Sequence, residues 1–368
     1  MKILNIPLTI RNLTLKNRIL LPPMAVVKGD MESRVTDELV AYYDEKAASG
    51  LFGLIVTEHC FVSPEGQASE RQLSVSRDSD IPGLRRIAEV IHKHGVPVIA
   101  QINHAGGAAK RGVTHLEPLS PSGIHSPGLG DPDLDPAILT PAEMDRIAED
   151  FAAAAARVKE AGFDGVEIHA AHAYLLCQFL SPITNLREDF YGGKTMAERL
   201  RFPLMVTAAV RKTVGPDYPI SLRLGACDYL PGGNTPAEAA EAACAFADAG
   251  IDLFDVSGGL CYYRRPGHKE AGYFSDQVRE IRKALHTRAG GSSAAGAEAG
   301  KCSVGAEAGV SGMAEAGVSG MAGNSIIPPV VLTGGIQTAG EAEAFLDDGT
   351  ADLIGLGRCI LNGTWKES

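Results

Sequence analysis

Short aliphatic runs alternate with longer amphipathic stretches along most of the chain. The short runs have the length and the β-branched content of buried strands. They lie at 19–21, 54–57, 96–99, 165–168, 220–224, 253–256, 329–332 and 353–354. The longer stretches have the spacing of amphipathic helices and lie at 37–49, 83–94, 141–161, 196–214, 236–249, 275–285 and 339–347. The pattern therefore predicts eight strands, most of them followed by a helix.

Eight strand–helix units favour a (β/α)8 TIM barrel, because parallel strands joined by helices close naturally at that number. A doubly wound sheet is the alternative, and it would be expected to carry a Gly-x-Gly-x-x-Gly turn after an early strand. The early strands of this chain are followed by no such turn. We therefore expect a single α/β barrel domain that spans residues 1–368.

Two segments do not fit the alternation of strand and helix. Residues 104–139 are rich in Pro, Gly and Ser and predict a long loop after the third strand. Residues 289–325 consist largely of Ala, Gly, Ser and Glu, and they contain an octapeptide repeated at 306–313 and 314–321. Such a composition has little packing potential, so we expect a disordered, low-complexity insertion loop before the seventh strand.

Composition narrows the class of protein. A formal net charge of −11 argues against nucleic acid as a partner, because phosphate binding needs clustered Lys and Arg. The chain has no signal-peptide pattern and no apolar run long enough to span a bilayer, so a soluble cytoplasmic protein is expected. Its 7 cysteines form no Cys-x-x-Cys pair, so we expect neither a disulfide framework nor a cysteine-bound metal site. The sequence leaves open whether the protein forms a homo-oligomer.

Barrel enzymes carry their chemistry at the C-terminal ends of the strands. After the last two predicted strands come Gly334-Gly335 and Gly357-Arg358. Backbone N–H groups of such turns bind phosphate, and a guanidinium adds a bidentate contact. Each glycine pair alone could be a tight turn, but two of them after neighbouring strands predict a phosphate site.

Gln101 and Arg223 are polar residues within or directly after hydrophobic strands. A buried Arg has only donors and needs an electron-rich or anionic partner, whereas a Gln offers both a donor and an acceptor. A salt bridge from Arg223 to Asp228, or to another loop carboxylate, is the structural alternative. Flavin mononucleotide (FMN) would satisfy both residues, with the Gln at its pyrimidine ring and the Arg near N1 and O2.

The segment that follows strand 165–168 concentrates the most reactive side chains. His169-x-x-His172-x-Tyr174 places two imidazoles and a phenol on one turn. Such a turn can grip an electron-rich oxygen and supply a proton nearby, which polarises and protonates an unsaturated carbonyl compound. A zinc-like histidine pair at a helix start, or histidines satisfied in the core, are the alternatives.

These residues resemble the old yellow enzyme family of FMN-dependent oxidoreductases, in its NADH:flavin oxidoreductase branch. The resemblance extends from about residue 8 to 361, apart from the insertion, and is most specific from His169 through Tyr191-Gly192-Gly193. It implies that NAD(P)H reduces FMN and that flavin N5 passes a hydride to an activated alkene, such as an α,β-unsaturated carbonyl compound. It also implies that His169 and His172 hold the small-molecule substrate's oxygen and that Tyr174 delivers a proton.

The resemblance implies the residues that bind the cofactor. They are Pro23, Met24, Ala25, Gln101, Arg223, Gly334, Gly335, Gly357 and Arg358. The chain departs from many relatives at Ala25, where they carry Thr or Cys, and at Gly107, where they carry Arg. No metal is expected.

Two other functions stay open at this stage. The chain ends about ten residues after Arg358 and lacks most of an eighth barrel helix, so a flavin-binding barrel without efficient turnover is one alternative. A flavin-free lyase or isomerase with a phosphate-binding barrel is the other. That enzyme would need a Schiff-base lysine or a carboxylate base at a strand end, and no predicted strand ends in Lys.

Overall fold

The computed structural model describes residues 2–131, 133–294 and 327–367. Eight parallel strands close into a barrel in the order β10-β11-β12-β3-β4-β5-β8-β9. The strands are β3 (Ile19–Leu21), β4 (Leu54–Phe61), β5 (Val98–Asn103), β8 (Gly165–Ala170), β9 (Ile220–Gly225), β10 (Leu253–Ser257), β11 (Val330–Thr333) and β12 (Leu353–Gly355). The predicted (β/α)8 barrel is confirmed, and closure of the sheet excludes the doubly wound alternative.

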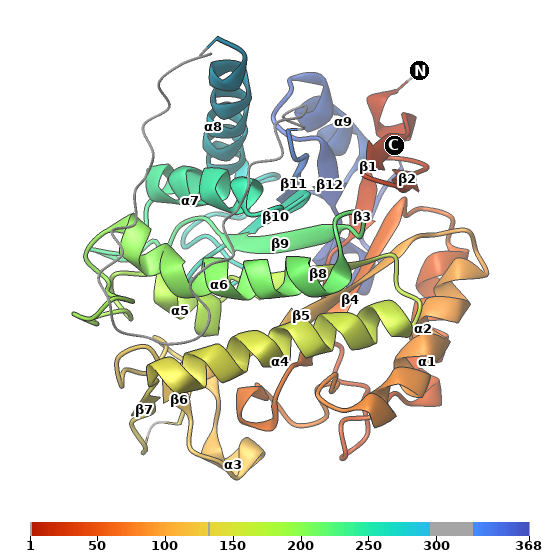
Figure 1. Ribbon diagram of the computed structural model, residues 1–368. Coiled ribbons are helices and arrows are strands. Elements are labelled where there is room, and N and C mark those ends of the chain that lie inside the picture. Colours follow the sequence, from red (N-terminus) through yellow and green to blue (C-terminus); the bar gives the residue numbers. More distant parts are fainter. Residues whose placement is uncertain (1, 132, 295–326, 368) are drawn as a thin grey trace.

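Helices surround the barrel (Figure 1). They are α1 (Asp37–Ala48), α2 (Ile81–His92), α4 (Pro141–Glu160), α6 (Met196–Val214), α7 (Pro236–Asp248), α8 (Ser275–Ala294) and α9 (Ala339–Asp347), and α10 (Arg358–Leu361) is a single turn after β12. Four of them begin with a Thr that accepts a backbone N–H three residues on, while the Glu at that position binds back to the Thr. These reciprocal caps satisfy N–H groups that the first helical turn leaves unpaired.

Several boundaries differ from the sequence prediction, and the ends of β4 and α8 are two of them. Strand β4 continues to Phe61, four residues beyond the expected end at Thr57. Helix α8 continues to Ala294, so the first residues of the predicted 289–325 insertion are helical and not a loop. The rest of that insertion, from residue 295, lies outside the described residues, and so does the octapeptide repeat.

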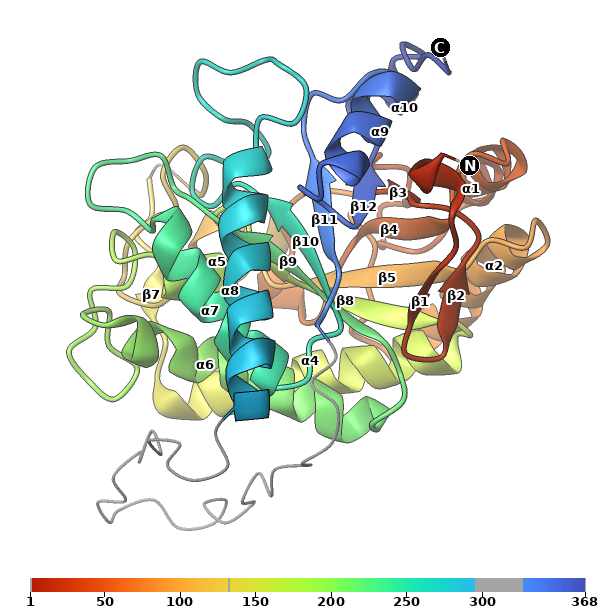
Figure 2. The ribbon, with the colours of Figure 1, turned by 90° about the horizontal axis from the view of Figure 1, so that it is seen from above.

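A hairpin that the sequence reading missed covers the N-terminal end of the barrel. Strands β1 (Leu8–Ile10) and β2 (Leu13–Leu15) pair antiparallel, and they appear in red in Figure 2. Their apolar side chains pack with one or two residues from six of the barrel strands, namely Leu20, Leu54, Val56, Ile99, Leu253, Val331 and Leu353. This cluster forms the floor of the barrel interior.

Shorter elements lie in the loops. They are the 3-10 turns η1 (Ile3–Asn5), η2 (Pro64–Gly66), η3 (Asp78–Asp80) and η4 (Gly106–Ala108), the helices α3 (Arg111–Thr114) and α5 (Leu175–Leu180), and the strands β6 (Leu119–Ser120) and β7 (Ala137–Ile138). Strands β6 and β7 pair with each other, so the predicted 104–139 excursion carries some regular structure of its own.

Inward positions alternate along each strand, which arranges the barrel interior in layers. Above the apolar floor lies a polar layer formed by Gln101, Glu167, Ser221, Arg223, Asp255 and Thr333. His169 lies two residues after Glu167 on β8 and pairs in register with Arg223 of β9. The side chains inside the barrel therefore change from apolar at the N-terminal end to titratable at the C-terminal end.

Three aspartates just before β8, β10 and β12 fasten neighbouring strands at the N-terminal end. Asp164, Asp252 and Asp352 each accept a hydrogen bond from the first residue of an adjacent strand, at 2.8, 2.9 and 2.9 Å. The backbone N–H of each aspartate donates back to the carbonyl of that same residue. A basic side chain completes each clamp: His92 with Asp164, Arg211 with Asp252 and Arg282 with Asp352.

Candidate active site

The C-terminal mouth of the barrel brings His169, His172 and Tyr174 together, as the sequence predicted. The ring centroids of His169 and His172 are 4.9 Å apart, and those of His169 and Tyr174 are 5.1 Å apart. His169 is the inward residue at the end of β8, and Tyr174 caps the start of α5. The three side chains therefore form one cluster that can act on a single ligand.

The turn that carries this cluster has an unusual backbone. His172 and Ala173 have φ values of 58° and 62°, in the left-handed region that non-glycine residues rarely adopt. Such conformations cost on the order of 1–3 kcal/mol each and persist where the surroundings fix them. Here Ser126 Oγ and Gln178 Nε2 both donate to the Ala173 carbonyl, at 2.6 and 2.7 Å. His172 N donates to Gly258 O at 3.1 Å.

Hydrogen bonds also direct the imidazole nitrogens. His169 Nδ1 accepts from the backbone N–H of Ala171 at 3.2 Å, so in the neutral ring the proton is on Nε2. His172 Nε2 contacts Ser257 Oγ at 2.7 Å, which directs Nδ1 away from that hydroxyl. His169 is thereby a hydrogen-bond donor of fixed tautomer.

Burial sets the charge state of the cluster. Loss of solvation lowers the pKa of His169 and of His172 well below the usual value, with the Arg223 guanidinium adding to the effect. Loss of solvation also raises the pKa of Tyr174 to about 12. At neutral pH the two imidazoles are therefore uncharged and the phenol keeps its proton.

The polar layer beneath the cluster explains why Arg223 is buried. The guanidinium lies beside Asp255 of β10, with Nη1 3.3 Å from Oδ2, so the alternative of a salt bridge to Asp228 does not hold. Asp228 instead accepts from Ser181 Oγ at 2.7 Å. Within the described part of the chain, Arg223 Nε is buried without a hydrogen-bond partner. That donor is available to a ligand above it.

Gln101 and Glu167 form a second pair in this layer. Gln101 Nε2 donates to Glu167 Oε1 at 2.9 Å, which fixes the orientation of the amide. Ser221 Oγ donates to the other carboxylate oxygen at 2.6 Å. Burial and the nearby Asp255 carboxylate raise the pKa of Glu167 to about 8. The layer therefore holds less negative charge at neutral pH than its two carboxyl groups suggest.

The glycine turns after β11 and β12 have the geometry that a close backbone approach requires. Gly334 and Gly335 have φ values of 104° and 74°, a conformation that favours glycine. A Cβ on Gly357 would lie 3.3 Å from Met24 Sδ, so this turn adjoins the loop after β3. Arg358 Nη2 donates to Tyr273 OH at 2.6 Å. These contacts tie the predicted phosphate residues to one side of the mouth.

The remaining predicted cofactor residues lie in the loop after β3. Arg223 Nη1 is 3.5 Å from the carbonyl oxygen of Pro23, so the loop reaches the polar layer. Ala25, next to Met24, is exposed. The structure thus links Pro23 and Met24 to other predicted residues by contact, and Ala25 is the exposed residue beside them.

Three residues that the sequence analysis did not assign belong to this neighbourhood. Ser257 contacts His172, and Gln178 holds the strained turn. His59 lies on β4 with its ring centroid 5.4 Å from that of Tyr174. Ser257 and His59 lie at or near the ends of predicted strands, and this position in the sequence could have marked them as site residues. Gln178 sits in a short apolar helix, and nothing in its sequence context indicates a role.

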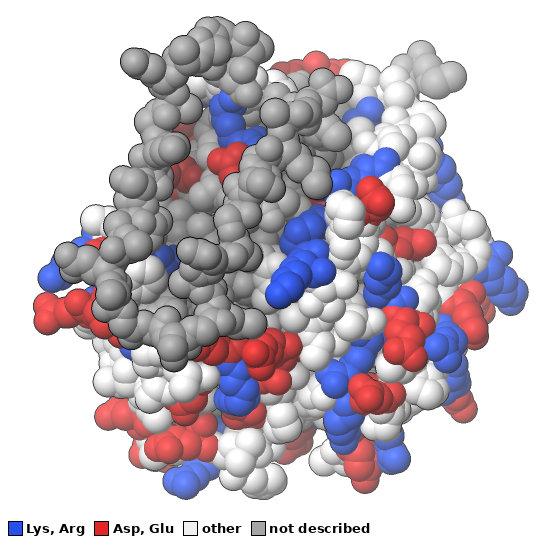
Figure 3. Space-filling view, in the orientation of Figure 1, with Lys and Arg blue, Asp and Glu red and all other residues white. Residues whose placement is uncertain are grey.

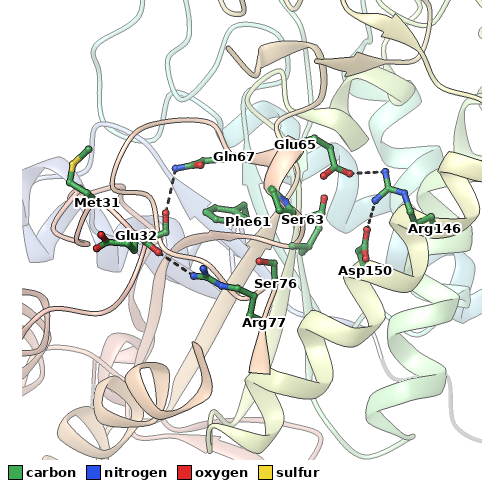
Figure 4. Close-up of a pocket in the computed structure, with 13 residues that line it drawn as sticks. Met31, Glu32, Phe61, Ser63, Glu65, Gln67, Ser76, Arg77, Arg146 and Asp150 are labelled. Carbon is green, nitrogen blue, oxygen red and sulfur yellow. Dashed lines mark hydrogen bonds and ion pairs between the residues drawn. The ribbon is translucent and has the colours of Figure 1, made fainter. Parts of the chain in front are cut away.

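A cavity of about 360 Å³ lies at the rim, apart from the histidine cluster. Figure 4 shows Arg146 of α4 reaching both Glu65 and Asp150, at 2.6 and 2.8 Å. On the face shown in Figure 3, basic residues are interspersed with acidic ones among the residues that are coloured. Neither feature changes the assignment of the mouth as the candidate active site.

Three further features of the described ranges concern metal binding, membrane crossing and the cysteines. No group of three or more His, Cys, Asp or Glu in them could hold a metal ion. No helix there is both long enough and apolar enough to cross a bilayer. The cysteines in the same ranges are free thiols.

Comparison with known proteins gives consistent matches. A family model described as the NADH:flavin oxidoreductase / NADH oxidase family matches residues 4–294. An NADH oxidase of Thermoanaerobacter brockii is 38% identical over 283 residues, which cover 75% of this chain and 43% of that protein. An NADPH dehydrogenase of Clostridium acetobutylicum is 38% identical over 252 residues, covering 68% of this chain and 72% of that one.

Solved structures agree. The old yellow enzyme homologue from Zymomonas mobilis matches with a TM-score of 0.74 at 26% identity, over 96% of this chain and 88% of that chain. The chain spans about half the length of the first curated relatives, since it covers 43% of the NADH oxidase and 47% of a metal reductase.

Proposed function

The chain belongs to the NADH:flavin oxidoreductase / NADH oxidase family, whose members use FMN with NAD(P)H as reductant, and we propose that it reduces activated alkenes. The substrate is a small molecule in which a carbonyl or similar oxygen activates a carbon–carbon double bond. Residues 1–368 act as one FMN-binding barrel domain in this proposal. The observation that carries it is the cluster of His169, His172 and Tyr174 at the barrel mouth.

The two imidazoles suit the task of holding an uncharged substrate oxygen. His169 presents Nε2–H as a donor, because the Ala171 N–H occupies its Nδ1. His172 is fastened to Ser257 through Nε2, so its Nδ1 is the nitrogen directed elsewhere. Donors fixed before the substrate arrives stabilise charge that develops on its oxygen during reduction, and need no rearrangement to do so.

Tyr174 suits the task of supplying the proton. Its pKa of about 12 keeps the phenol protonated at neutral pH, so the proton is present when the substrate carbon needs it. Its ring lies edge-on to that of His169, with an interplanar angle of 90°. His169 would therefore hold the substrate oxygen while the neighbouring Tyr174 donates a proton to the substrate carbon.

The residues around the mouth fit FMN. Arg223 Nε is a buried donor without a partner in the described chain, which suits an electron-rich heterocycle edge. Gly334 and Gly335 allow the Tyr273 ring and the Glu270 backbone to approach the turn closely, and Arg358 donates to the Tyr273 hydroxyl at the same side. Pro23, Met24 and Gln101 would line the flavin, and Ala25 is proposed with them on resemblance alone. FMN when bound supplies the hydride chemistry, which no side chain here can provide.

Stopped-flow measurement of both half-reactions tests this function. In His169→Ala, oxidation of the reduced protein by an enone should slow by about 10²–10³, the usual loss for one oxyanion donor. Reduction by NAD(P)H should slow less, because no oxygen has to be polarised in that step. Tyr174→Phe should keep enone binding and lose turnover.

Two controls make the outcome decisive. Tyr191→Phe removes a hydroxyl from a tyrosine that packs against the core and is not part of the cluster, and it should leave both half-reactions unchanged. Equal slowing of both half-reactions in His169→Ala would indicate a damaged flavin site. Unchanged enone reduction in both cluster variants would contradict the proposed function.

A further inference from the structure

Strand β4 contains an irregularity that decides which of its side chains face the mouth. Leu54 and Val56 point into the barrel floor, and Ile55 packs outside it. Between Thr57 and Cys60 the pairing with β5 shifts, so that two residues of β4 stand opposite Gln101 alone. Cys60 packs in the outer core. The bulge thus turns His59 toward the mouth, whereas the Glu58 carboxyl accepts from the backbone of Val26 and Val27 in the loop after β3.

His59 is the one that reaches the histidine cluster. Its ring centroid is 5.4 Å from that of Tyr174 and 5.9 Å from that of His169, with the His169 ring edge-on to it. Bulges near active sites commonly re-aim a side chain in this way. A third imidazole therefore joins His169 and His172 at the mouth.

Neighbouring amides fix the tautomer of His59. Gln72 Nε2 lies 2.9 Å from His59 Nδ1. The Gln72 amide cannot be flipped without loss, because its Oε1 accepts from the backbone N–H of Ala68 at 2.7 Å. Asn103 Nδ2 approaches the same nitrogen at 3.3 Å. Nδ1 is therefore an acceptor, and in the neutral ring the proton resides on Nε2.

The same surroundings keep the ring neutral. Burial, and then the Arg223 guanidinium, lower the pKa of His59 to about 4. The Nε2 of an imidazole lies across the ring from Nδ1, so Nε2–H points away from Gln72 and Asn103. The rings of Tyr174 and His169 are the other groups it faces.

We propose that His59 is a third hydrogen-bond donor to the substrate and that it favours alkenes activated by two carbonyl groups. The pair His169 and His172 would hold one carbonyl oxygen, and His59 Nε2–H would hold the second. The His59 and His169 ring centroids are 5.9 Å apart, so His59 is a donor at a separate position from the pair that holds the first oxygen. This inference rests on the proposed function, since it takes the same mouth as the substrate site.

Binding of two saturated ligands tests the inference without turnover. Succinimide and 2-pyrrolidinone differ by one carbonyl group, and neither carries an alkene. Each is titrated into the FMN-loaded protein while the flavin absorbance is followed. The parent should bind succinimide about tenfold more tightly, the size of one added hydrogen bond. His59→Ala should reduce that preference to about twofold or less, and His59→Gln, which keeps an N–H donor, should retain part of it.

Gln72→Leu and Gln67→Leu form a matched pair. Gln67 lies on the same loop and binds Ser69 O at 2.9 Å, so it controls for general disturbance of the loop. Gln72→Leu should weaken the preference because the tautomer is no longer fixed, and Gln67→Leu should keep it. A parent protein without the preference, or equal weakening of both ligands in His59→Ala, would overturn the inference.

Turnover separates this inference from the proposed function. Rates are measured with maleimide and with 1,5-dihydropyrrol-2-one, which again differ by one carbonyl. Normal reduction of both alkenes without a His59-dependent preference would overturn the role of His59 alone. A His59-dependent binding preference in a protein that reduces neither alkene would support His59 and contradict the alkene reductase.

Discussion

The two ends of the barrel differ in whether their polar side chains are paired. At the N-terminal end, Asp164, Asp252 and Asp352 each hold a backbone N–H and a basic side chain. At the C-terminal end, Asp255 has two buried carboxylate oxygens without a hydrogen-bond partner within the described residues, although Arg223 lies close by. The base is built for stability, and the mouth keeps donors and acceptors available.

The backbone follows the same division. At the base the three clamps repeat one geometry with regular strand pairing. At the mouth, His172 and Ala173 adopt left-handed conformations and β4 carries its bulge. Strain of this kind is tolerated where other interactions fix the structure, and it collects at functional sites. The difference predicts that mouth variants change chemistry and base variants change folding.

The largest expected effect is at the mouth. His172→Ala should slow reduction of an enone by about 10²–10³, since it removes one of two oxygen-binding groups. Its unfolding free energy in urea should change by less than about 1 kcal/mol, because the side chain is half-buried and Ala adopts the same backbone with similar strain. A loss of stability comparable to that of base variants would contradict the division between the two ends.

The converse variant is Asp252→Ala at the base. It leaves Arg211 without its carboxylate and Ile220 N without its acceptor, so stability should fall by about 3 kcal/mol. Turnover per mole of bound FMN should remain that of the parent. Asp217→Ala, at an exposed aspartate nearby, is the control and should alter neither quantity. Lower turnover in Asp252→Ala at full FMN occupancy would show that the base and the mouth are coupled.

Arg358 tests whether the glycine turns at the mouth hold a phosphate. Arg358→Ala should weaken FMN retention by about 1.5–3 kcal/mol, the value of a charge-assisted contact, as measured by dialysis and flavin fluorescence. Arg358→Lys should retain part of the affinity, because it keeps the charge and loses the planar fork. Retention equal to the parent in both variants would place the phosphate elsewhere.

The smallest expected effect is an acid-sensitive contribution from buried histidines. His59 and His104 have pKa values of about 4, lowered by burial, whereas unfolded histidine titrates near 6.5. Between those values the unfolded state binds more protons, so stability falls as the pH drops from about 6.5 to 4. Each histidine contributes less than about 1.4 kcal/mol per pH unit.

Urea unfolding at pH 7, 6 and 5 measures this slope. His104→Asn should flatten the slope, because one of the groups that titrates on unfolding is gone. His115→Asn, at an exposed position, should leave it unchanged. An identical slope in all three proteins would mean that other groups control acid stability.

Local periodicity carried most of the fold prediction. Helices α6 and α9 have the predicted bounds, and each begins with a reciprocal cap between a Thr and the Glu three residues on. The β1–β2 hairpin was not predicted, because strands of three residues are too short to show a recognisable alternation of apolar and polar positions. The end of β4 escaped because the bulge interrupts the alternation that marks a strand.

The candidate site was predictable where its residues are close in sequence. His169, His172 and Tyr174 lie within six positions, so one segment revealed them. The Asp255 partner of Arg223 could not be predicted, because the two residues are neighbours only through the pairing of β9 with β10. The Gln178 contact to Ser126, the Ser257 contact to His172 and the Gln72 contact to His59 also join segments that are apart in sequence. Such contacts follow from closure of the barrel and not from spacing.

The bulge in β4 also has an evolutionary meaning. Two residues stand where regular pairing would admit one, and they differ in character: Glu58 is acidic and His59 is a donor. Loss of the codon for Glu58 would restore regular pairing and keep the histidine inward. Loss of the codon for His59 would restore the same pairing and remove the imidazole from the mouth. In the role that we propose for His59, the length of this strand would therefore alter substrate preference while the His-x-x-His-x-Tyr turn stays the same.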